Sequence, residues 1–179
     1  MIDVVLAMLD AGGYDAVQMK EVASQAQVSL ATLYAEFGPR EELIVTALEL
    51  WMTDHIWVNF DVPVSTPTSV YDGLMTIMRA VFEPWESHPR ILAAFHRARS
   101  SEPGRARLQL FGLPQTSPMV DAMTTNLEPD FVADGGLILY NVMYALVARC
   151  AEGDIEVTEI LPMLERTVYR LMEHRPELS

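Results

Sequence analysis

Cysteine is nearly absent from this 179-residue sequence, in which Cys150 is the only one. A single cysteine cannot form a disulfide within the chain, and this is typical of proteins from a reducing cytoplasm. Long apolar runs are also missing, since none approaches the ~18 consecutive apolar residues of a membrane helix. The first nine residues include Asp3 and no basic segment, so no signal peptide is predicted. We therefore expect a cytoplasmic protein that does not enter a membrane.

Basic residues are scarce. The chain has 12 lysines and arginines against 25 aspartates and glutamates, a formal net charge of −13. This balance favours solubility and disfavours a broad nucleic-acid-binding surface, because nucleic acid is itself strongly negative. If DNA is bound, a few local contacts must overcome an unfavourable overall field.

The residue patterns of catalytic and metal sites are missing too. The four histidines (His55, His88, His96 and His174) are scattered, and no two of them have the i, i+4 spacing of a metal-binding helix. No glycine-rich loop could cradle a phosphate, and Cys150 ends an apolar segment where an inert buried thiol is expected. We therefore expect no enzyme, no metal and no cofactor.

What the sequence does contain is apolar residues at helical spacing, with no alternation of period two. It predicts an all-α fold of about nine helices. Residues 61–68, rich in proline, serine and threonine, form the clearest loop. We expect an N-terminal helix-turn-helix domain over residues 1–45 and a larger helical domain over residues 46–179.

Two short helices predicted at residues 19–26 and 30–37 have the layout of a DNA-reading helix-turn-helix. Their apolar residues repeat at i, i+3, i+4 and i+7, namely Met19, Val22, Ala23 and Ala26, then Leu30, Leu33, Tyr34 and Phe37. Ser29 stands where an N-cap belongs. Helices this short must pack on each other and on a third one. Ala31, Thr32, Ala35 and Glu36 are then left on the outer face of the second helix.

Two later segments have unusually wide apolar surfaces. Residues 69–85 carry two neighbouring apolar stripes, one of Val70, Leu74, Ile77, Met78 and Val81 and the other of Tyr71, Met75, Met78, Phe82 and Trp85. We expect Pro84 to kink or end this helix. Residues 137–150 are apolar all round except for Asn141 and Arg149. Such a helix must be covered on every side, so we expect its own core on one side and a second chain on the other.

The N-terminal residues resemble the DNA-binding domain of TetR-type transcriptional regulators over roughly the first fifty positions. The resemblance is carried by Gly13-Tyr14, Met19, Val22-Ala23, Ala26, Val28-Ser29, Thr32-Leu33-Tyr34, Phe37 and Arg40-Glu41-Glu42-Leu43. The run over residues 13–19 is further similar to the KstR-like subgroup of this family. The rest of the chain matches only in its helical layout.

The resemblance implies a homodimer with a three-helix DNA-binding domain and a larger ligand-binding and dimerisation domain. The expected function is a ligand-responsive repressor that binds a palindromic double-stranded operator and leaves it when a small apolar or acyl-type effector enters a cavity. The last two helices of each subunit would form the dimer interface. The alternative is a small-molecule-binding dimer that keeps this fold but no longer binds DNA.

The expected DNA contacts are Lys20, Ser29, Ala31, Thr32, Tyr34 and Arg40. A threonine hydroxyl can reach a base edge or a phosphate, and a small alanine allows close approach. Tyr34 could instead only pack, and Lys20 and Arg40 could be ordinary solvated charges instead of phosphate anchors.

Three departures from the family pattern weaken this expectation. Gln27 replaces the usual turn glycine, which costs on the order of 1 kcal/mol if the position needs a positive φ. Glu36 would repel phosphate. The first fifty residues contain two basic residues against eight acidic ones, a net charge of −6, and lack the family's basic arm. Either a basic segment precedes the given residues, or DNA binding is weak or lost.

Aromatic and methionine residues suggest the effector cavity, because flexible apolar walls suit bulky apolar ligands. The candidates are Tyr71, Met75, Met78, Phe82, Trp85, Phe95, Met123, Tyr140, Asn141 and Tyr144, each of which could be plain core instead. Asn141 could bond a ligand, a symmetry mate or its own helix. An arginine cluster (Arg90, Arg97, Arg99, Arg105 and Arg107) could hold an anionic ligand end or be a solvated surface. The candidates for the dimer interface are Leu139, Met143, Leu146, Val168 and Met172.

Overall fold

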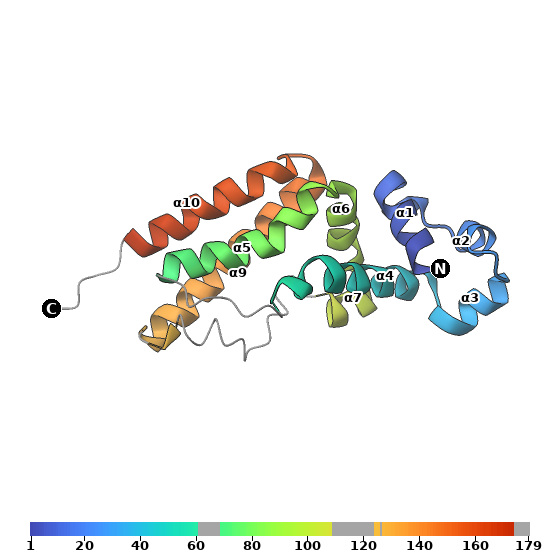
Figure 1. Ribbon diagram of the computed structural model, residues 1–179, viewed down its shortest axis with the longest axis horizontal. Coiled ribbons are helices and arrows are strands. Elements are labelled where there is room, and N and C mark those ends of the chain that lie inside the picture. The colour runs from blue at the N-terminus through green and yellow to red at the C-terminus, as the bar shows by residue number, and fades with distance from the viewer. Residues whose placement is uncertain (61–68, 109–123, 126, 174–179) are drawn as a thin grey trace. The chain divides into compact units, whose positions relative to one another are not determined.

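The computed structural model of the chain describes residues 1–60, 69–108, 124–125 and 127–173. Within these ranges the chain forms nine α-helices and three short 3-10 helices, and no strand (Figure 1). The predicted all-α fold of about nine helices is confirmed.

The helices begin and end close to where apolar spacing places them. The α-helices are α1 (Ile2–Gly12), α2 (Met19–Gln25), α3 (Leu30–Phe37), α4 (Arg40–His55), α5 (Val70–Glu86), α6 (Pro89–Ala98), α7 (Glu102–Arg107), α9 (Pro129–Glu152) and α10 (Ile160–Glu173). The 3-10 helices are η1 (Tyr14–Ala16), η2 (Trp57–Phe60) and η3 (Val157–Glu159).

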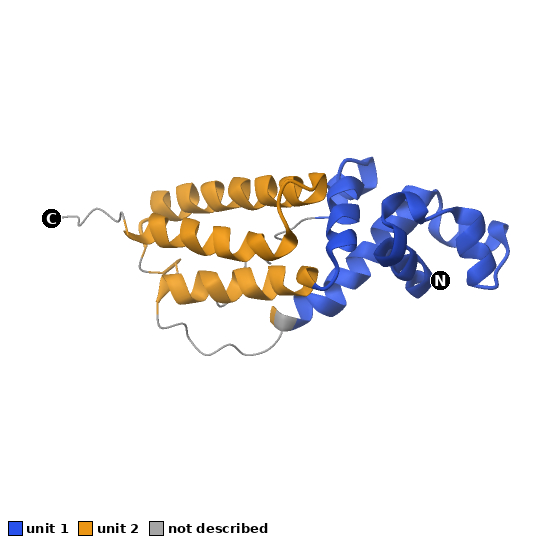
Figure 2. Cartoon of the chain, turned by 90° about the horizontal axis from the view of Figure 1, so that it is seen from above, with its two compact units in different colours: residues 1–58, 87–110 blue, residues 59–86, 111–179 orange. Residues whose placement is uncertain are grey.

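The chain divides into two compact units, coloured separately in Figure 2. Unit 1 is Met1–Val58 with Ser87–Leu110, and unit 2 is Asn59–Glu86 with Phe111–Ser179. These units do not coincide with a division after residue 45, because α6 and α7 group with the N-terminal helices. That division stays a prediction about the chain's domains.

Helix α4 is the centre of unit 1. It packs against α1, α3, α6 and α7. Seven of its residues are buried, including Leu43, Leu48 and Trp51, which is why its apolar positions are not confined to one stripe. At the other end of the unit, α2 packs on α3, with Leu33 of α3 fully buried. The short helices α2 and α3 are therefore held by a longer neighbour, as their length requires.

The loop between α1 and α2 is held by two arginines. The Tyr14 ring has the guanidinium groups of Arg40 and Arg97 each 4.6 Å from its centroid. The Arg97 Nη1 atom also lies 2.5 Å from the Asp15 carboxylate. Each cation over an aromatic face contributes about 0.5–1 kcal/mol at an exposed site. Helices α4 and α6 are thus tied to the segment that leads into α2.

In unit 2, α10 packs along both α5 and α9 (Figures 1 and 2). Its fully buried side chains are those of Ile160, Leu164 and Val168. Helix α5 does not end at Pro84 but runs on to Glu86. Because Pro84 has no N–H to donate to the Ala80 carbonyl, the last turn of α5 forms with one backbone hydrogen bond fewer.

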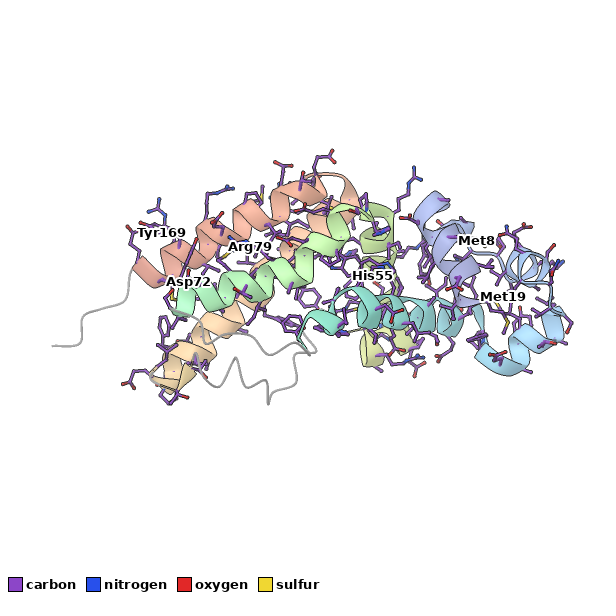
Figure 3. All side chains as sticks on the ribbon, in the orientation of Figure 1. Met8, Met19, His55, Asp72, Arg79 and Tyr169 are labelled. Atoms are coloured by element: carbon purple, nitrogen blue, oxygen red, sulfur yellow. The ribbon has the colours of Figure 1, made fainter. Side chains whose placement is uncertain are left out.

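Helix α9 leaves much of its apolar surface uncovered. Leu137 is 62% exposed, and Ile138 and Tyr140 are exposed as well. On α10, Tyr169 also points outward (Figure 3). By length and composition α9 could cross a membrane, because it has 24 residues and its most apolar 18-residue window has a mean hydropathy of 1.6. Only 22% of that window is buried within the protein. Asn141 and a few charged residues interrupt the apolar side chains of α9, which is why its sequence contains no continuous apolar run of that length.

Candidate functional site

The start of α3 is built as Ser29 predicts. The Ser29 Oγ atom accepts a hydrogen bond from the Thr32 backbone N–H at 3.0 Å and lies 2.7 Å from the Thr32 hydroxyl. This N-cap satisfies one of the free N–H groups at the helix start. It also fixes Thr32 in place on the exposed side of the helix.

The turn between α2 and α3 contains Gln27, whose φ is 55°. Among the described residues other than glycine, it is the one with a positive φ. The turn is closed by the Val28 N–H, which donates to the Ala23 carbonyl at 3.0 Å. The position that usually holds glycine therefore needs the left-handed conformation, and Gln27 adopts it at a cost.

Replacing Gln27 with glycine is expected to raise the free energy of unfolding by about 0.5–1 kcal/mol, because the strain outweighs glycine's greater freedom in the unfolded chain. Urea denaturation followed by circular dichroism measures this change in the free energy of unfolding. Gln25→Gly, at the last position of α2, is the matched control and should lower the free energy of unfolding by about 0.5 kcal/mol, because it also removes the hydrogen bond that Gln25 donates to the Glu21 carboxylate. A loss of stability in Gln27→Gly would show that the turn is not strained.

The outer face of α3 is exposed and small. Ala31, Thr32, Ala35 and Glu36 are exposed, while Leu33 faces the core. Tyr34 is 50% exposed, so its ring is not simply part of the packing beneath α3. This face offers a hydroxyl, a phenol and two small residues, together with one carboxylate that repels phosphate.

The two cations expected to anchor phosphates are placed differently. The Arg40 guanidinium is turned inward, where Nε donates to the Val17 carbonyl at 2.5 Å and Nη2 donates to the Tyr14 carbonyl. Lys20 is exposed, and its side chain makes no hydrogen bond or ion pair with another described residue. In the structure, Lys20 can reach a phosphate without breaking a contact, and Arg40 cannot.

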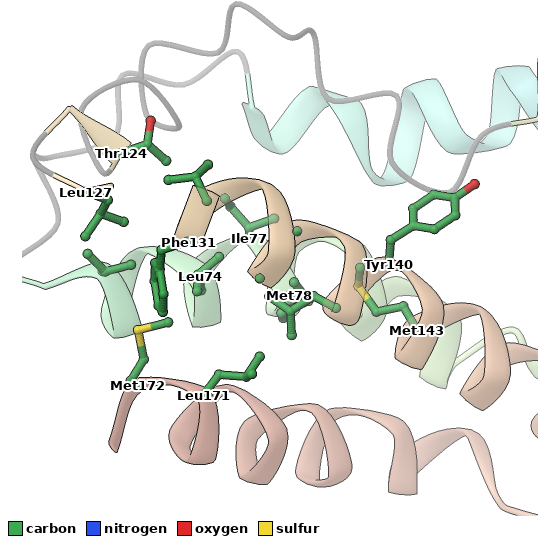
Figure 4. Close-up of a pocket in the computed structure, with 15 residues that line it drawn as sticks. Leu74, Ile77, Met78, Thr124, Leu127, Phe131, Tyr140, Met143, Leu171 and Met172 are labelled. Carbon is green, nitrogen blue, oxygen red and sulfur yellow. The ribbon is translucent and has the colours of Figure 1, made fainter. Parts of the chain in front are cut away.

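Unit 2 contains a cavity of about 250 Å³, shown in Figure 4. It is walled by α5 and α9, by the end of α10 and by two residues that precede α9. The lining residues are Val70, Leu74, Ile77, Met78, Thr124, Leu127, Phe131, Val132, Gly135, Gly136, Leu139, Tyr140, Met143, Leu171 and Met172. Nearly all of the lining is apolar, which is the character of a small-molecule site.

Two family models match the chain, one after the other. Residues 2–47 match the model described as "Bacterial regulatory proteins, tetR family". Residues 68–171, more than half of the chain, match the model described as "Tetracyclin repressor-like, C-terminal domain". The chain belongs to the TetR family.

Individual TetR-family proteins are similar over different spans. The "HTH-type transcriptional repressor KstR" of Rhodococcus jostii (strain RHA1) is 46% identical over 48 residues, which are 27% of this chain and 23% of that protein. The KstR of Mycobacterium tuberculosis (strain ATCC 25618 / H37Rv) is 44% identical over 48 residues, which are 27% of this chain and 22% of its own. The chain thus matches less than a quarter of the length of these relatives.

Two solved TetR-family structures are similar over nearly the whole chain. A TetR transcriptional regulator from Rhodococcus sp. RHA1 has a TM-score of 0.67 at 19% identity, covering 99% of this chain and 94% of its own. A TetR-like transcriptional regulator from the same source has a TM-score of 0.58 at 18% identity, covering 97% and 94%. At these identities the similarity shows the fold. The relatives and neighbours are transcriptional regulators and not enzymes.

The cavity of this TetR-family chain uses few of the residues predicted for it. Met78 and Tyr140 line it, whereas Met75, Phe82 and Trp85 are buried core residues of α5. Three others point elsewhere or lie in unit 1: Tyr71 donates to Glu165 at 3.1 Å, Asn141 donates to the Leu137 carbonyl of its own helix at 2.8 Å, and Phe95 is buried in α6. Tyr144 is half-buried outside the lining, and Met123 falls outside the described residues.

The sequence signal for the cavity was the aliphatic stripe of α5 and not the aromatic one. Val70, Leu74, Ile77 and Met78 line the cavity together. On α9, Phe131, Gly135, Leu139 and Met143 follow one another at steps of four and line the facing wall. The large side chains of the other stripe of α5, Met75, Phe82 and Trp85, fill the core instead, and which residues bind an effector stays a prediction.

Most of the residues predicted for the dimer interface lie inside the subunit. Leu139, Met143, Leu146 and Val168 are buried within unit 2 and are not on its surface. Met172 is half-buried and lines the cavity, as do Leu139 and Met143. Because α9 is apolar all round, its sequence does not mark which side faces outward. The exposed apolar residues of the described region, including Leu137, Ile138, Tyr140 and Tyr169, are the better candidates for a partner.

The arginine cluster does not line the cavity. Arg90 donates to the Ala11 carbonyl, Arg97 pairs with Asp15, and Arg107 pairs with Glu42 and Glu49.

The thiol of Cys150 is not activated. Burial and the neighbouring Glu156 carboxylate raise the pKa of the Cys150 thiol above its ordinary value. A thiol of this kind is mostly protonated at neutral pH and is a poor nucleophile.

Proposed function

We propose that this TetR-family protein is a cytoplasmic, ligand-responsive repressor that binds a palindromic operator as a homodimer. The observation that carries the proposal is the exposed face of α3, with Thr32 and Tyr34 presented beside the Ser29 cap, in a chain matched by both family models. The matched relatives named as KstR are transcriptional repressors, and the similarity to them covers 48 residues. In this proposal α3 enters the major groove of DNA as a recognition helix.

The effector would act through the connection between α5 and α6. Helix α5 supplies four residues to the cavity, and only Ser87 and His88 separate it from α6. Within unit 1, the start of α6 contacts the end of α1: His88 Nδ1 lies 3.2 Å from an Asp10 carboxylate oxygen, and Arg90 donates to the Ala11 carbonyl. Farther along α6, Arg97 pairs with Asp15 ahead of α2. A ligand that favours another position of α5 would therefore disturb contacts that hold the DNA-binding helices.

A homodimer is supported by the uncovered apolar surface of unit 2. Leu137, Ile138 and Tyr140 on α9 and Tyr169 on α10 are exposed, although such residues are rarely left in water as a group. A second copy that presents the same surface would bury them in a two-fold interface. Two subunits would also present two copies of α3 to the two halves of a palindrome.

The alternative function is a ligand-binding dimer that no longer binds DNA. It is favoured by the net charge of −6 in the first fifty residues and by Arg40, which is committed to the Tyr14 and Val17 carbonyls. Both functions use the same cavity and dimer, and they differ only at α3.

Electrophoretic mobility shifts with fragments from upstream of the protein's own gene separate the two functions. A repressor should shift one fragment, and Tyr34→Ala should weaken binding about 10-fold, the value of one lost base contact of 1–3 kcal/mol. Glu36→Gln should strengthen binding, because it removes a charge that repels phosphate. The exposed substitution Thr76→Ala in unit 2 is the control and should change nothing.

The salt dependence adds a second readout. Each neutralised phosphate contributes about −0.9 to the slope of log K against log salt, and Lys20 and Arg40 are the only lysine or arginine side chains in residues 1–58. Because Arg40 is held by the Tyr14 and Val17 carbonyls, we expect a slope of about −2 for the dimer, from its two Lys20 side chains. If no upstream fragment shifts even at about 50 mM salt, the DNA-free alternative replaces the repressor.

A further inference from the structure

The described walls of the cavity in unit 2 carry no charge. None of its described lining residues is acidic or basic, and the hydroxyl groups of Thr124 and Tyr140 are the polar side-chain groups among them. The Tyr140 hydroxyl points away from the other lining residues in Figure 4. An ionised group placed between these walls would lose its water and gain no partner, which is strongly unfavourable.

The arginines of unit 2 do not supply a counter-charge to the cavity. Arg79, Arg149, Arg166 and Arg170 are exposed, and none of them lines it. Arg149 lies 4.0 Å from Asp154, and Arg170 lies 3.6 Å from Glu173. Outside the described residues, the sequence contains a single lysine or arginine, Arg175, with Glu177 close behind it. An acid held wholly inside the cavity would therefore meet no cation among the described residues.

Two glycines in one wall give the cavity part of its space. Gly135 and Gly136 lie inside α9 and line the cavity, and a Cβ atom added to either would meet nothing within 4 Å. Neither has a positive φ, and a glycine inside a helix is less stable than an alanine. Neither backbone conformation nor close packing requires glycine there, in contrast to Gly104, where a Cβ would lie 2.0 Å from the Ala98 carbonyl oxygen. What the two glycines provide is an open wall.

We propose that the cavity selects a neutral, apolar ligand, and that Gly135 and Gly136 set the largest ligand that it accepts. This inference rests on the proposed effector function and names the ligand class of that site. The cavity's volume of about 250 Å³ exceeds the roughly 150 Å³ in which a single benzene ring binds, so a ligand of more than one ring fits. A flat ring can approach the backbone of α9 closely at the two glycines. Fatty acids and other acyl anions that bury their charged end are excluded.

A matched pair of fluorescent dyes tests the ligand's charge. N-phenyl-1-naphthylamine is neutral, and 8-anilino-1-naphthalenesulfonate has the same ring skeleton with one sulfonate. In fluorescence titrations of the full chain, the neutral dye is expected to bind at least about 10-fold more tightly, because the sulfonate finds no partner. Equal or tighter binding of the sulfonate would overturn the proposal.

Variants on α9 test where the dye sits and what the glycines do. Gly135→Leu should weaken binding of the neutral dye at least about 10-fold, because the leucine occupies the open wall. Ala133→Leu adds the same side chain at an exposed position of the same helix that does not line the cavity, and should leave binding unchanged. Circular dichroism and thermal unfolding check that both variants are folded. Equal affinity of Gly135→Leu and the unchanged protein would refute the role of the glycines.

One more arm separates this inference from the proposed function. Ile138→Ser reduces the exposed apolar surface of α9, and binding of the neutral dye should survive it. Loss of binding in Ile138→Ser together with its retention in Gly135→Leu would place the dye on the surface and overturn the inference. Mobility shifts measure operator binding separately from dye binding. The two results are therefore independent: a failure to bind DNA would contradict the repressor function and leave the ligand class unaffected, and a preference for the charged dye would contradict only the ligand class.

Discussion

Ile138→Asp is expected to convert the protein from dimer to monomer and to weaken operator binding at least about 100-fold. Ile138 is exposed on α9, so the aspartate costs little in the isolated subunit but would be buried without a partner at the proposed dimer interface. A monomer also loses the gain from binding two half-sites at once, which is on the order of 10²–10⁴. Sedimentation velocity measures the first effect, and mobility shifts measure the second.

Two further substitutions make this result specific. Arg79→Asp introduces the same side chain at an exposed position of α5, and the dimer should survive it. Leu146→Asp places the charge in the core of unit 2, where Leu146 is 6% exposed, and should unfold that unit instead of separating folded subunits. A dimer that is unchanged in Ile138→Asp would mean that subunits associate through another surface.

Gly104→Ala is expected to lower the free energy of unfolding by about 2–4 kcal/mol, near the upper end of what overpacking costs. The added Cβ would lie 2.0 Å from the Ala98 carbonyl oxygen and 3.0 Å from the Arg99 Cα. Both are backbone atoms, so no side chain can rotate aside to make room. Urea denaturation of the full chain measures the loss.

The damage should extend along α7. Moving Gly104 breaks the Ser101 N-cap, in which the Gly104 N–H donates to Oγ at 3.1 Å. It also pulls Arg107 away from α4, where Nη1 donates to Glu42 at 2.8 Å and Nε donates to Glu49 at 3.0 Å. Gly136→Ala is the matched control and should raise the free energy by up to about 1 kcal/mol, since its Cβ meets nothing. Equal stability of the two variants would show that α6 and α7 do not pack as closely as described.

Local features were predictable from the sequence because their causes are local. The bounds of α1, α2 and α3 follow from apolar spacing, and the start of α3 follows from Ser29. The strain at Gln27 followed from the family's turn glycine, and its φ of 55° agrees with that expectation. In each case the residues concerned are within a few positions of one another.

Features that depend on distant residues were not predictable. Arg40 looked like a phosphate anchor, but its partner carbonyls at Tyr14 and Val17 are 26 and 23 residues away. The cavity depends on which of two apolar stripes of α5 faces α9, and no single stripe carries that information. Which side of α9 faces outward was not predictable either, because a helix without a polar face gives no sign of its orientation.

The inward turn of Arg40 has a consequence for how fast the protein would find its operator. Positively charged proteins approach DNA rapidly, because their cations attract the phosphates over a distance and allow the protein to slide along the DNA. Here the chain carries a net charge of −13, and Arg40 is withheld within unit 1. An operator search by this protein would proceed without electrostatic steering, at association rates nearer the 10⁵–10⁶ M⁻¹s⁻¹ of unassisted encounters. Occupancy of the operator would then depend on slow dissociation of the repressor. An effector that raises the dissociation rate would control that occupancy directly.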